Sequence, residues 1–199
     1  GSMTNSVAVN WNEDCLSLNV CTPRVDDKKR PVLVWIHGGA FRSGQGAIPW
    51  YNGTSFALKG NVVVVSINYR LGALGFTDLS RFGEEYATSG INGIYDQIKA
   101  LEWVRDNIAN FGGDPSRITI AGESAGGFSV STILGSERAQ GLFHRAIAQS
   151  GHVRSLTASE AHNPEREFPM VDRGSWEVVR ELGLTNAQVD AETLRAVSM

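Results

Sequence analysis

The sequence predicts an α/β fold, in which a mostly parallel central sheet carries helices on both faces. Several strand-length runs are continuously apolar, which is typical of strands buried on both faces. Between two of them lies a stretch with apolar residues at helical spacing. Strands that alternate with helices favour a parallel sheet with helical layers on either side. The chain has 199 residues, 42% of them hydrophobic, which is enough to bury a core.

Five segments are expected to be strands. The first, residues 16–20, alternates apolar and polar residues and stops before Pro23. The other four are mainly apolar runs, at residues 31–36, 62–67, 117–121 and 145–149. A charged stretch, Asp26–Arg30, separates the first two strands, and we expect it to be a solvated loop.

The helical pattern lies at residues 94–108. Its apolar side chains follow one another at intervals of three or four and form one face, made of Ile94, Ile98, Leu101, Val104 and Ile108. The helix is expected to end before Gly112 and Gly113. Two shorter helices are predicted in the more polar C-terminal part, at residues 175–183 and 187–197.

Composition narrows the classes of function. A formal net charge of −3 argues against a nucleic-acid partner. No apolar run reaches the roughly 18 residues of a membrane span. On one strand, Cys15 and Cys21 would lie about 20 Å apart, and a disulfide needs Cα atoms within about 7 Å, so they cannot pair. We expect no metal and no cofactor, and the cellular location stays open.

The most informative segment is Gly122-Glu123-Ser124-Ala125-Gly126, which follows a predicted buried strand. A serine between two glycines at a strand-to-helix turn is typical of a nucleophile elbow, where small neighbours permit a strained backbone. The N–H of Ala125, at the start of the next helix, would then stabilise an oxyanion. A simpler interpretation is a glycine-rich turn that only packs closely. A dinucleotide fingerprint is a poor fit, because its central glycine is replaced by Ser124.

A second motif, His37-Gly38-Gly39-Ala40-Phe41, follows the strand ending at Ile36. Esterase oxyanion holes take N–H donors from such a loop, because only backbone with little side chain can approach the carbonyl oxygen. We therefore expect Gly39 and Ala40 to be donors, and His37 to be a hydrogen-bonded structural residue. The alternative for the loop is an ordinary tight turn.

With these motifs the sequence resembles the type-B carboxylesterase/lipase family, which includes cholinesterases and bacterial p-nitrobenzyl esterases. Phe111–Gly126 (FGGDPSRITIAGESAG) matches the family's nucleophile signature at every specified position. A second signature is matched at 13–16, 18–20 and 23, while Ser17 and Cys21 depart from it. Residues 68–72 and 142–151 also resemble family segments. The similarity is dense over residues 13–151 and implies an α/β-hydrolase fold.

The resemblance implies roles for individual residues. Ser124 would be the acyl-enzyme nucleophile, Gly38 would shape the oxyanion loop, and the oxyanion donors would be Gly39, Ala40 and Ala125. Glu123 would lie near the pocket, or else be a buried carboxylate paired with a cation such as Arg70. Cys15 would be a free thiol, since its family partner is absent from this chain. Candidate pocket walls are Phe41, Trp50, Tyr51 and Phe128, although such aromatics more often pack in a core.

A catalytic base and acid are not found in this chain. A serine hydroxyl needs a base, and in this fold the acid and then the histidine follow the serine in sequence. His144 lies in a family segment without a catalytic role, and His152 and His162 follow the elbow too closely. The acidic residues Glu160, Glu165, Glu167 and Asp172 fit a solvated loop.

We therefore expect Gly1–Met3 to be a cloning remnant with its start Met, and residues 4–199 to be a partial α/β-hydrolase domain. An exposed sheet edge would remain beyond residues 145–149. The leading hypothesis is a carboxylic-ester hydrolase acting on small-molecule esters, completed by a second fragment or a homodimer partner. The alternatives are a non-catalytic, cholinesterase-like interaction protein, an inactive truncated protein, or an acyltransferase or amidase.

Overall fold

The computed structural model describes residues 12–151 and residue 181. The two helices predicted near the C-terminus lie outside the described residues, apart from residue 181. The chain divides into two compact units, and each is described by itself. In the described part, the larger unit comprises residues 12–70 and 94–151, and the smaller comprises residues 71–93.

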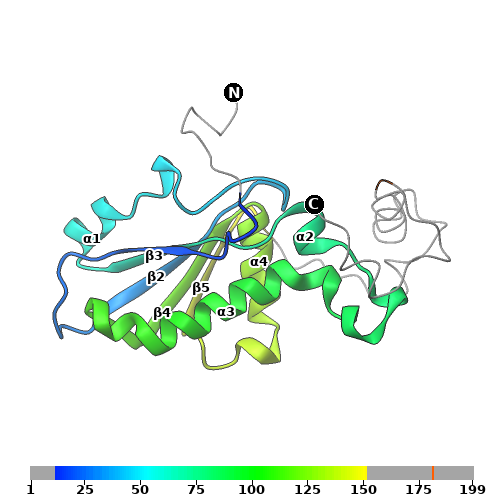
Figure 1. The fold of residues 1–199 in the computed structure, drawn as a ribbon. Helices are drawn as coiled ribbons and strands as arrows, with labels where there is room; N and C mark the ends of the chain where they lie inside the picture. Colours follow the sequence, from blue (N-terminus) through cyan, green and yellow to red (C-terminus); the bar gives the residue numbers. More distant parts are fainter. Residues whose placement is uncertain (1–11, 152–180, 182–199) are drawn as a thin grey trace. The chain divides into compact units, whose positions relative to one another are not determined.

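A five-stranded sheet forms the centre of the larger unit (Figure 1). Its spatial order is β1-β3-β2-β4-β5, and only β1 runs antiparallel to its neighbour. The strands are β1 (Leu18–Cys21), β2 (Arg30–Ile36), β3 (Val63–Ile67), β4 (Gly113–Glu123) and β5 (Arg145–Gln149). All five predicted strands are therefore present, and the sheet is mostly parallel as expected.

Helices cover both faces of this sheet. From β2 the chain passes through α1 (Thr54–Gly60) to β3, the neighbouring strand on one side. It then crosses in the opposite direction, from β3 through α3 (Asn92–Asn107) to β4 and from β4 through α4 (Ala125–Leu134) to β5. Because such crossovers are right-handed, α1 lies on one face and α3 and α4 on the other (Figure 1). A hydrogen bond of 3.1 Å from Gln97 Nε2 to Ser129 Oγ joins α3 to α4. In the part of the chain described, no helix is long and apolar enough to cross a membrane.

The predicted helix is confirmed, and four of the five residues of its apolar face are buried, while Ile94 is half-buried. Ile98, Leu101, Val104 and Ile108 are each at most 5% exposed. Helix α1 was not predicted, because only Ala57 among its residues is buried and it carries no apolar stripe. The smaller unit contains α2 (Gly72–Phe76), also unpredicted. Short 3₁₀ helices complete the described fold, at Pro49–Tyr51, Ser80–Phe82, Glu84–Tyr86, Ser89–Ile91, Ile108–Phe111 and Glu137–Ala139.

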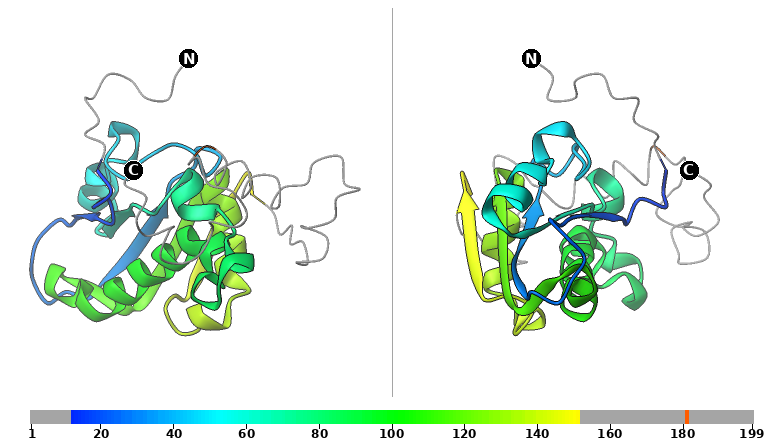
Figure 2. Two further views of the ribbon diagram at one scale, coloured as in Figure 1. Left: turned by 45° about the vertical axis from the view of Figure 1, so that its right-hand side comes forward. Right: turned by 90° about the vertical axis from the view of Figure 1, so that its left-hand side faces the viewer.

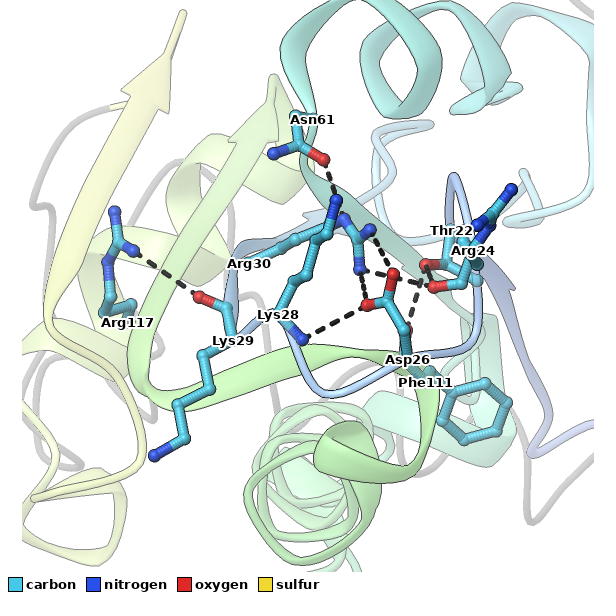
Figure 3. Close-up of polar contacts among 9 residues, drawn as sticks. All are labelled: Thr22, Arg24, Asp26, Lys28, Lys29, Arg30, Asn61, Phe111 and Arg117. Carbon is cyan, nitrogen blue, oxygen red and sulfur yellow. Dashed lines mark hydrogen bonds and ion pairs between the residues drawn. The ribbon is translucent and has the colours of Figure 1, made fainter.

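The amino ends of β2 and β4 are joined by a buried arginine. Arg30 is 3% exposed, and its guanidinium donates to the two carboxylate oxygens of Asp26 at 2.5 and 2.9 Å (Figure 3). Its Nε donates to Asn61 Oδ1 at 2.7 Å, and its backbone N–H to Gly112 O at 2.9 Å. The prediction of a solvated loop at Asp26–Arg30 is therefore wrong for both ends of that stretch.

These contacts determine the charge of the carboxylate. Hydrogen bonding from Arg30 lowers the pKa of Asp26 to about 2, against the opposing effect of burial. A further bond of 2.9 Å from Thr22 Oγ1 to Phe111 O fastens the segment after β1 to the connection before β4. The amino end of the sheet is thus held by side chains of β2 and of two connections, and by backbone carbonyls of a third.

The other edge of the sheet is open. All five residues of β5 are exposed, and Ile147 is 47% exposed. Among the described residues β5 pairs with β4 alone, and the right-hand view of Figure 2 shows it as the outer strand. The exposed edge expected from the sequence is therefore present in the described part. Cys15 and Cys21 are both free, although only Cys21 lies within β1.

Candidate active site

Ser124 lies at a sharp turn between β4 and α4. Its backbone has φ 55° and ψ −121°, a conformation that non-glycine residues rarely adopt. The turn needs glycine at position 126, because a Cβ there would lie 2.0 Å from Ile36 O. The strand-turn-helix geometry of the elbow is thus the one that the glycine pattern predicts.

The backbone groups of Ser124 are already bonded. Its N–H donates to Gln149 O at 2.9 Å, and its carbonyl accepts from the Phe128 N–H at 2.9 Å. Ala125 is the first residue of α4 and is 2% exposed. An N–H in the first turn of a helix, such as that of Ala125, has no partner within that helix.

The glycine loop after β2 meets this elbow. A Cβ on Gly38 would lie 2.7 Å from Glu123 O and 3.2 Å from Ser124 Cβ. The next three residues all have positive φ, with Gly39 at 120°, Ala40 at 56° and Phe41 at 58°. Two motifs far apart in sequence are therefore adjacent in the fold, and both hold strained backbone.

Hydrogen bonds within the loop occupy its carbonyl groups. Gly39 O accepts from the N–H groups of Arg42 at 3.0 Å and Ser43 at 3.1 Å. Gly38 O accepts from His37 Nδ1 at 2.8 Å, which requires a proton on that nitrogen. The carbonyls are thus bonded inside the loop.

His37 is part of the core. It is 1% exposed and stacks on Tyr69 with ring centroids 4.5 Å apart. Burial lowers the pKa of His37, and the bond to Gly38 opposes this only in part, so the ring is neutral at neutral pH. Tyr69 Oη donates to His37 O at 2.8 Å. These contacts support the structural role expected for His37.

Glu123 lies beside the loop. Its Oε2 would be 3.2 Å from a Cβ on Gly38. Burial raises the pKa of Tyr51, the charge of Glu123 raises it further, and a backbone hydrogen bond from Gly38 lowers it, so Tyr51 also lies at this site. The suggested pairing of Glu123 with Arg70 is wrong. Arg70 forms a two-pronged ion pair with Asp96, at 2.8 Å from Nε and 2.7 Å from Nη2.

The candidate pocket aromatics differ in their surroundings. Phe41 and Phe128 are half-buried, and both adjoin the loop or elbow in the chain. Trp50 is 76% exposed, so within the described residues it is a surface side chain. Its neighbour Tyr51 is the better buried of the two, with its ring 5.4 Å from that of Trp35.

The described residues offer Ser124 no histidine base. His144 Nδ1 accepts from the Ile118 backbone N–H at 3.2 Å, and the His144 backbone N–H donates to Ile118 O at 2.8 Å. Ser124 lies six positions beyond Ile118 along the strand, or about 20 Å. His152 and His162 lie outside the described residues, as do the acidic residues between 160 and 172. No group of three His, Cys, Asp or Glu within the described ranges could hold a metal ion.

Residues 2–183 match the model of the carboxylesterase family. The chain belongs to this family. It is 45% identical over 179 residues to para-nitrobenzyl esterase of Bacillus subtilis, a match covering 90% of this chain and 34% of that relative. It is 49% identical over 140 residues to phenmedipham hydrolase of Pseudarthrobacter oxydans, covering 70% and 27%.

Solved carboxylesterases have the same fold. A carboxylesterase of Geobacillus stearothermophilus superposes with a TM-score of 0.80 at 46% identity, covering 93% of this chain and 37% of that one. The fold is therefore an α/β-hydrolase, as the sequence predicts. The chain spans about a third of the length of the carboxylesterases it matches.

Sequence reasoning missed two parts of the site. It did not place Tyr69 against His37, nor Gly44 behind the loop. Both contacts depend on how the chain returns to the loop, which no local spacing reveals. The roles assigned to Ser124, Gly39, Ala40 and Ala125 stay predictions, since geometry alone tests none of them.

Proposed function

We propose that the chain carries the nucleophile and oxyanion hole of a carboxylic-ester hydrolase acting through a serine acyl-enzyme. The observation that carries the proposal is the contact between Gly38 and Ser124, which joins two separate motifs at the carboxyl ends of parallel strands. Family membership adds support, because several relatives are named carboxylesterases.

In the proposed mechanism, Ser124 Oγ attacks the ester carbonyl carbon and loses its proton to a general base. The carbonyl oxygen takes the negative charge and accepts hydrogen bonds from the N–H groups of Gly39, Ala40 and Ala125. The alcohol then leaves with the proton from the base, and water attacks the acyl-serine to release the acid. The amino end of α4 adds a favourable dipole at Ser124.

The base and its acid must come from elsewhere, because the described residues supply neither. The open edge of β5 is where the missing part would join, as a further strand beside residues that are all exposed. We propose that a second fragment provides the base and the acid; a second copy of this chain would cover the edge without supplying either. The substrate class is a small carboxylic ester, and the sequence and geometry do not narrow it further.

A fluorophosphonate probe tests the proposal, because it forms a covalent bond with an activated serine. The complemented chain should be labelled at one site, and Ser124→Ala should abolish the labelling. Ser129→Ala is the matched control, since Ser129 lies on the same helix, fully buried and bonded to Gln97. Labelling that persists in Ser124→Ala would exclude Ser124 as nucleophile.

Turnover of p-nitrophenyl acetate by the complemented chain distinguishes the alternative. A non-catalytic interaction protein would bind partners but give neither turnover nor labelling under any complementation. That alternative is favoured by one observation, the lack of a base for Ser124 among the described residues. Intact mass and oligomeric state would show whether a second chain is present.

A further inference from the structure

We propose that His37 is a positioning residue for the oxyanion hole. Its Nδ1–H holds the Gly38 carbonyl and so fixes the direction of the Gly39 N–H, the first of the proposed donors. This inference rests on the proposed acyl-transfer function and assigns part of that site to a buried side chain that does not touch the substrate.

The argument begins with the peptide group. The Gly38 carbonyl and the Gly39 N–H belong to one planar trans unit, so they point in opposite directions. Glycine on both sides leaves this unit free to rotate unless something holds it. The hydrogen bond of 2.8 Å from His37 Nδ1 to Gly38 O turns the carbonyl into the protein. The Gly39 N–H must then point away from His37, to the side opposite that carbonyl.

The imidazole itself is held on several sides. Its ring is 1% exposed and stacks on Tyr69 at an interplanar angle of 21°. The Tyr69 hydroxyl donates to His37 O, which fixes the backbone as well as the ring. On the loop side Gly44 leaves just enough room, because a Cβ there would lie 2.5 Å from His37 Nδ1 and 2.7 Å from Gly38 O.

The neighbouring donor is fixed in another way. Gly39 O accepts two backbone N–H groups, from Arg42 and Ser43, and by the same geometry this orients the Ala40 N–H. Two backbone N–H groups, with a longer bond of 3.4 Å from Ser43 Oγ, therefore position Ala40, whereas the His37 side chain positions Gly39. Removing the imidazole should weaken one donor and leave the Ala40 donor in place.

The test compares His37→Leu with His37→Asn. Leucine removes the donor, while asparagine places an N–H near the position of Nδ1. In protein that the probe labels at Ser124, we expect His37→Leu to lower the phosphonylation rate constant about 10- to 100-fold, less than the loss of a whole donor. In His37→Asn most of the rate should return. The KM for p-nitrophenyl acetate should change little in either variant.

His144→Leu is the matched control, because it also removes an imidazole that hydrogen-bonds to backbone, but at the middle of β4, about 20 Å from Ser124. Its labelling rate should equal that of the parent. If His37→Leu fails to fold, Gly44→Ala tests the same bond with His37 retained, and should slow labelling in a similar way. Parental rates in His37→Leu, or in a folded Gly44→Ala, would overturn the proposal.

A second measurement does not depend on catalysis. Nitrogen-15 NMR of the uncomplemented chain reports which ring nitrogen of His37 carries the proton. We expect the Nδ1–H form, with scalar coupling from Nδ1 to the Gly38 carbonyl carbon. An Nε2–H form would overturn the positioning role even if Ser124 is labelled. Conversely, failure to label Ser124 in the parent would refute the proposed function while this spectrum still tests His37.

Discussion

The two ends of the parallel strands are held together by different kinds of contact. At the carboxyl ends of β2 and β4, backbone meets backbone, and the approach is so close that Gly126 has no space for a methyl group. At the amino ends, Arg30, Asp26 and Asn61 meet through side chains (Figure 3). The carboxyl end therefore depends on residues that lack side chains, and the amino end depends on hydrogen bonds between side chains.

The difference extends to strain. The carboxyl end holds Ala40, Phe41 and Ser124 at positive φ, each at a cost of about 1–3 kcal/mol. At the amino end, Lys29 and Asn61 both have φ 50°, but Asn61 is the left-handed cap of α1, a conformation that asparagine adopts readily, and the buried guanidinium has its charge matched by Asp26. Backbone strain is therefore greater at the carboxyl end, where the chemistry is proposed. The amino end, which has a structural role, is stabilised by paired polar side chains.

The largest effect is expected from Gly126→Ala. Its Cβ would overlap Ile36 O at 2.0 Å, so β2 and α4 would have to move apart, and we expect more than about 3 kcal/mol of destabilisation. Urea unfolding measures it. Gly135→Ala at the far end of the same helix is the control: its Cβ would sit 3.7 Å from Thr132 O at a φ of −89°. That variant should change stability by less than about 1 kcal/mol, and equal losses in the two would refute the contrast.

The second largest effect on stability is expected from Arg30→Met, which removes contacts at the amino end of the strands alone. The substitution leaves Asp26 and Asn61 without their donor, so thermal unfolding should occur at a lower temperature. Labelling of Ser124 should not change, because the elbow lies at the opposite ends of the strands. Arg117→Met is the matched control, since Arg117 is exposed and its hydrogen bond within the described part of the chain is a long one, to Lys29 O at 3.5 Å. A loss of labelling in a folded Arg30→Met would show that the two ends are coupled.

The carboxyl end was the more predictable of the two from sequence. Close backbone contact there requires residues without side chains, and the sequence has glycines around Ser124 and after His37. Such patterns are local and can be recognised in the sequence. The amino end was misjudged, because Asp26–Arg30 looks like any solvated charged turn. Arg30 is buried only because Asn61 and Gly112 arrive from distant parts of the chain.

The same reasoning explains other successes and failures. The face of α3 repeats at helical spacing and was recognised, whereas α1 buries Ala57 alone and left no pattern. The pairing of Arg70 with Asp96 rather than Glu123 follows from the position of α3, which no spacing encodes. Contacts between distant segments are the part that sequence reasoning could not supply.

Ser124→Gly should have a moderate and opposite effect on stability. Glycine adopts φ 55° and ψ −121° without steric cost, and the released strain exceeds the added chain entropy, so we expect a gain of about 1 kcal/mol. Ser124→Ala keeps the Cβ and should gain little. Both variants lose labelling. Urea unfolding compares the two variants, and equal stabilities would show that the strain at the elbow is no larger than the added chain entropy.

The smallest expected effect is a difference in how the stability of the two ends depends on pH. Burial lowers the pKa of His37 below 6.5, so below that pH the unfolded chain binds a proton that the folded chain does not. The stability linked to His37 is therefore complete above pH 6.5 and declines as the pH falls. The pKa of Asp26 is lowered from 3.8 to about 2, so its contribution is complete above pH 3.8 and declines only between these values.

Unfolding free energies measured from pH 6.5 down to 3.8 separate these contributions. Over this interval His37→Asn should lose less stability than the parent, by at most about 1.4 kcal/mol per pH unit. Asp26→Asn should parallel the parent there, and should lose less than the parent only below pH 3.8. If Asp26→Asn instead flattened the upper interval, the carboxylate would be titrating within it, and the amino end would lack the strong ion pair that distinguishes it from the elbow.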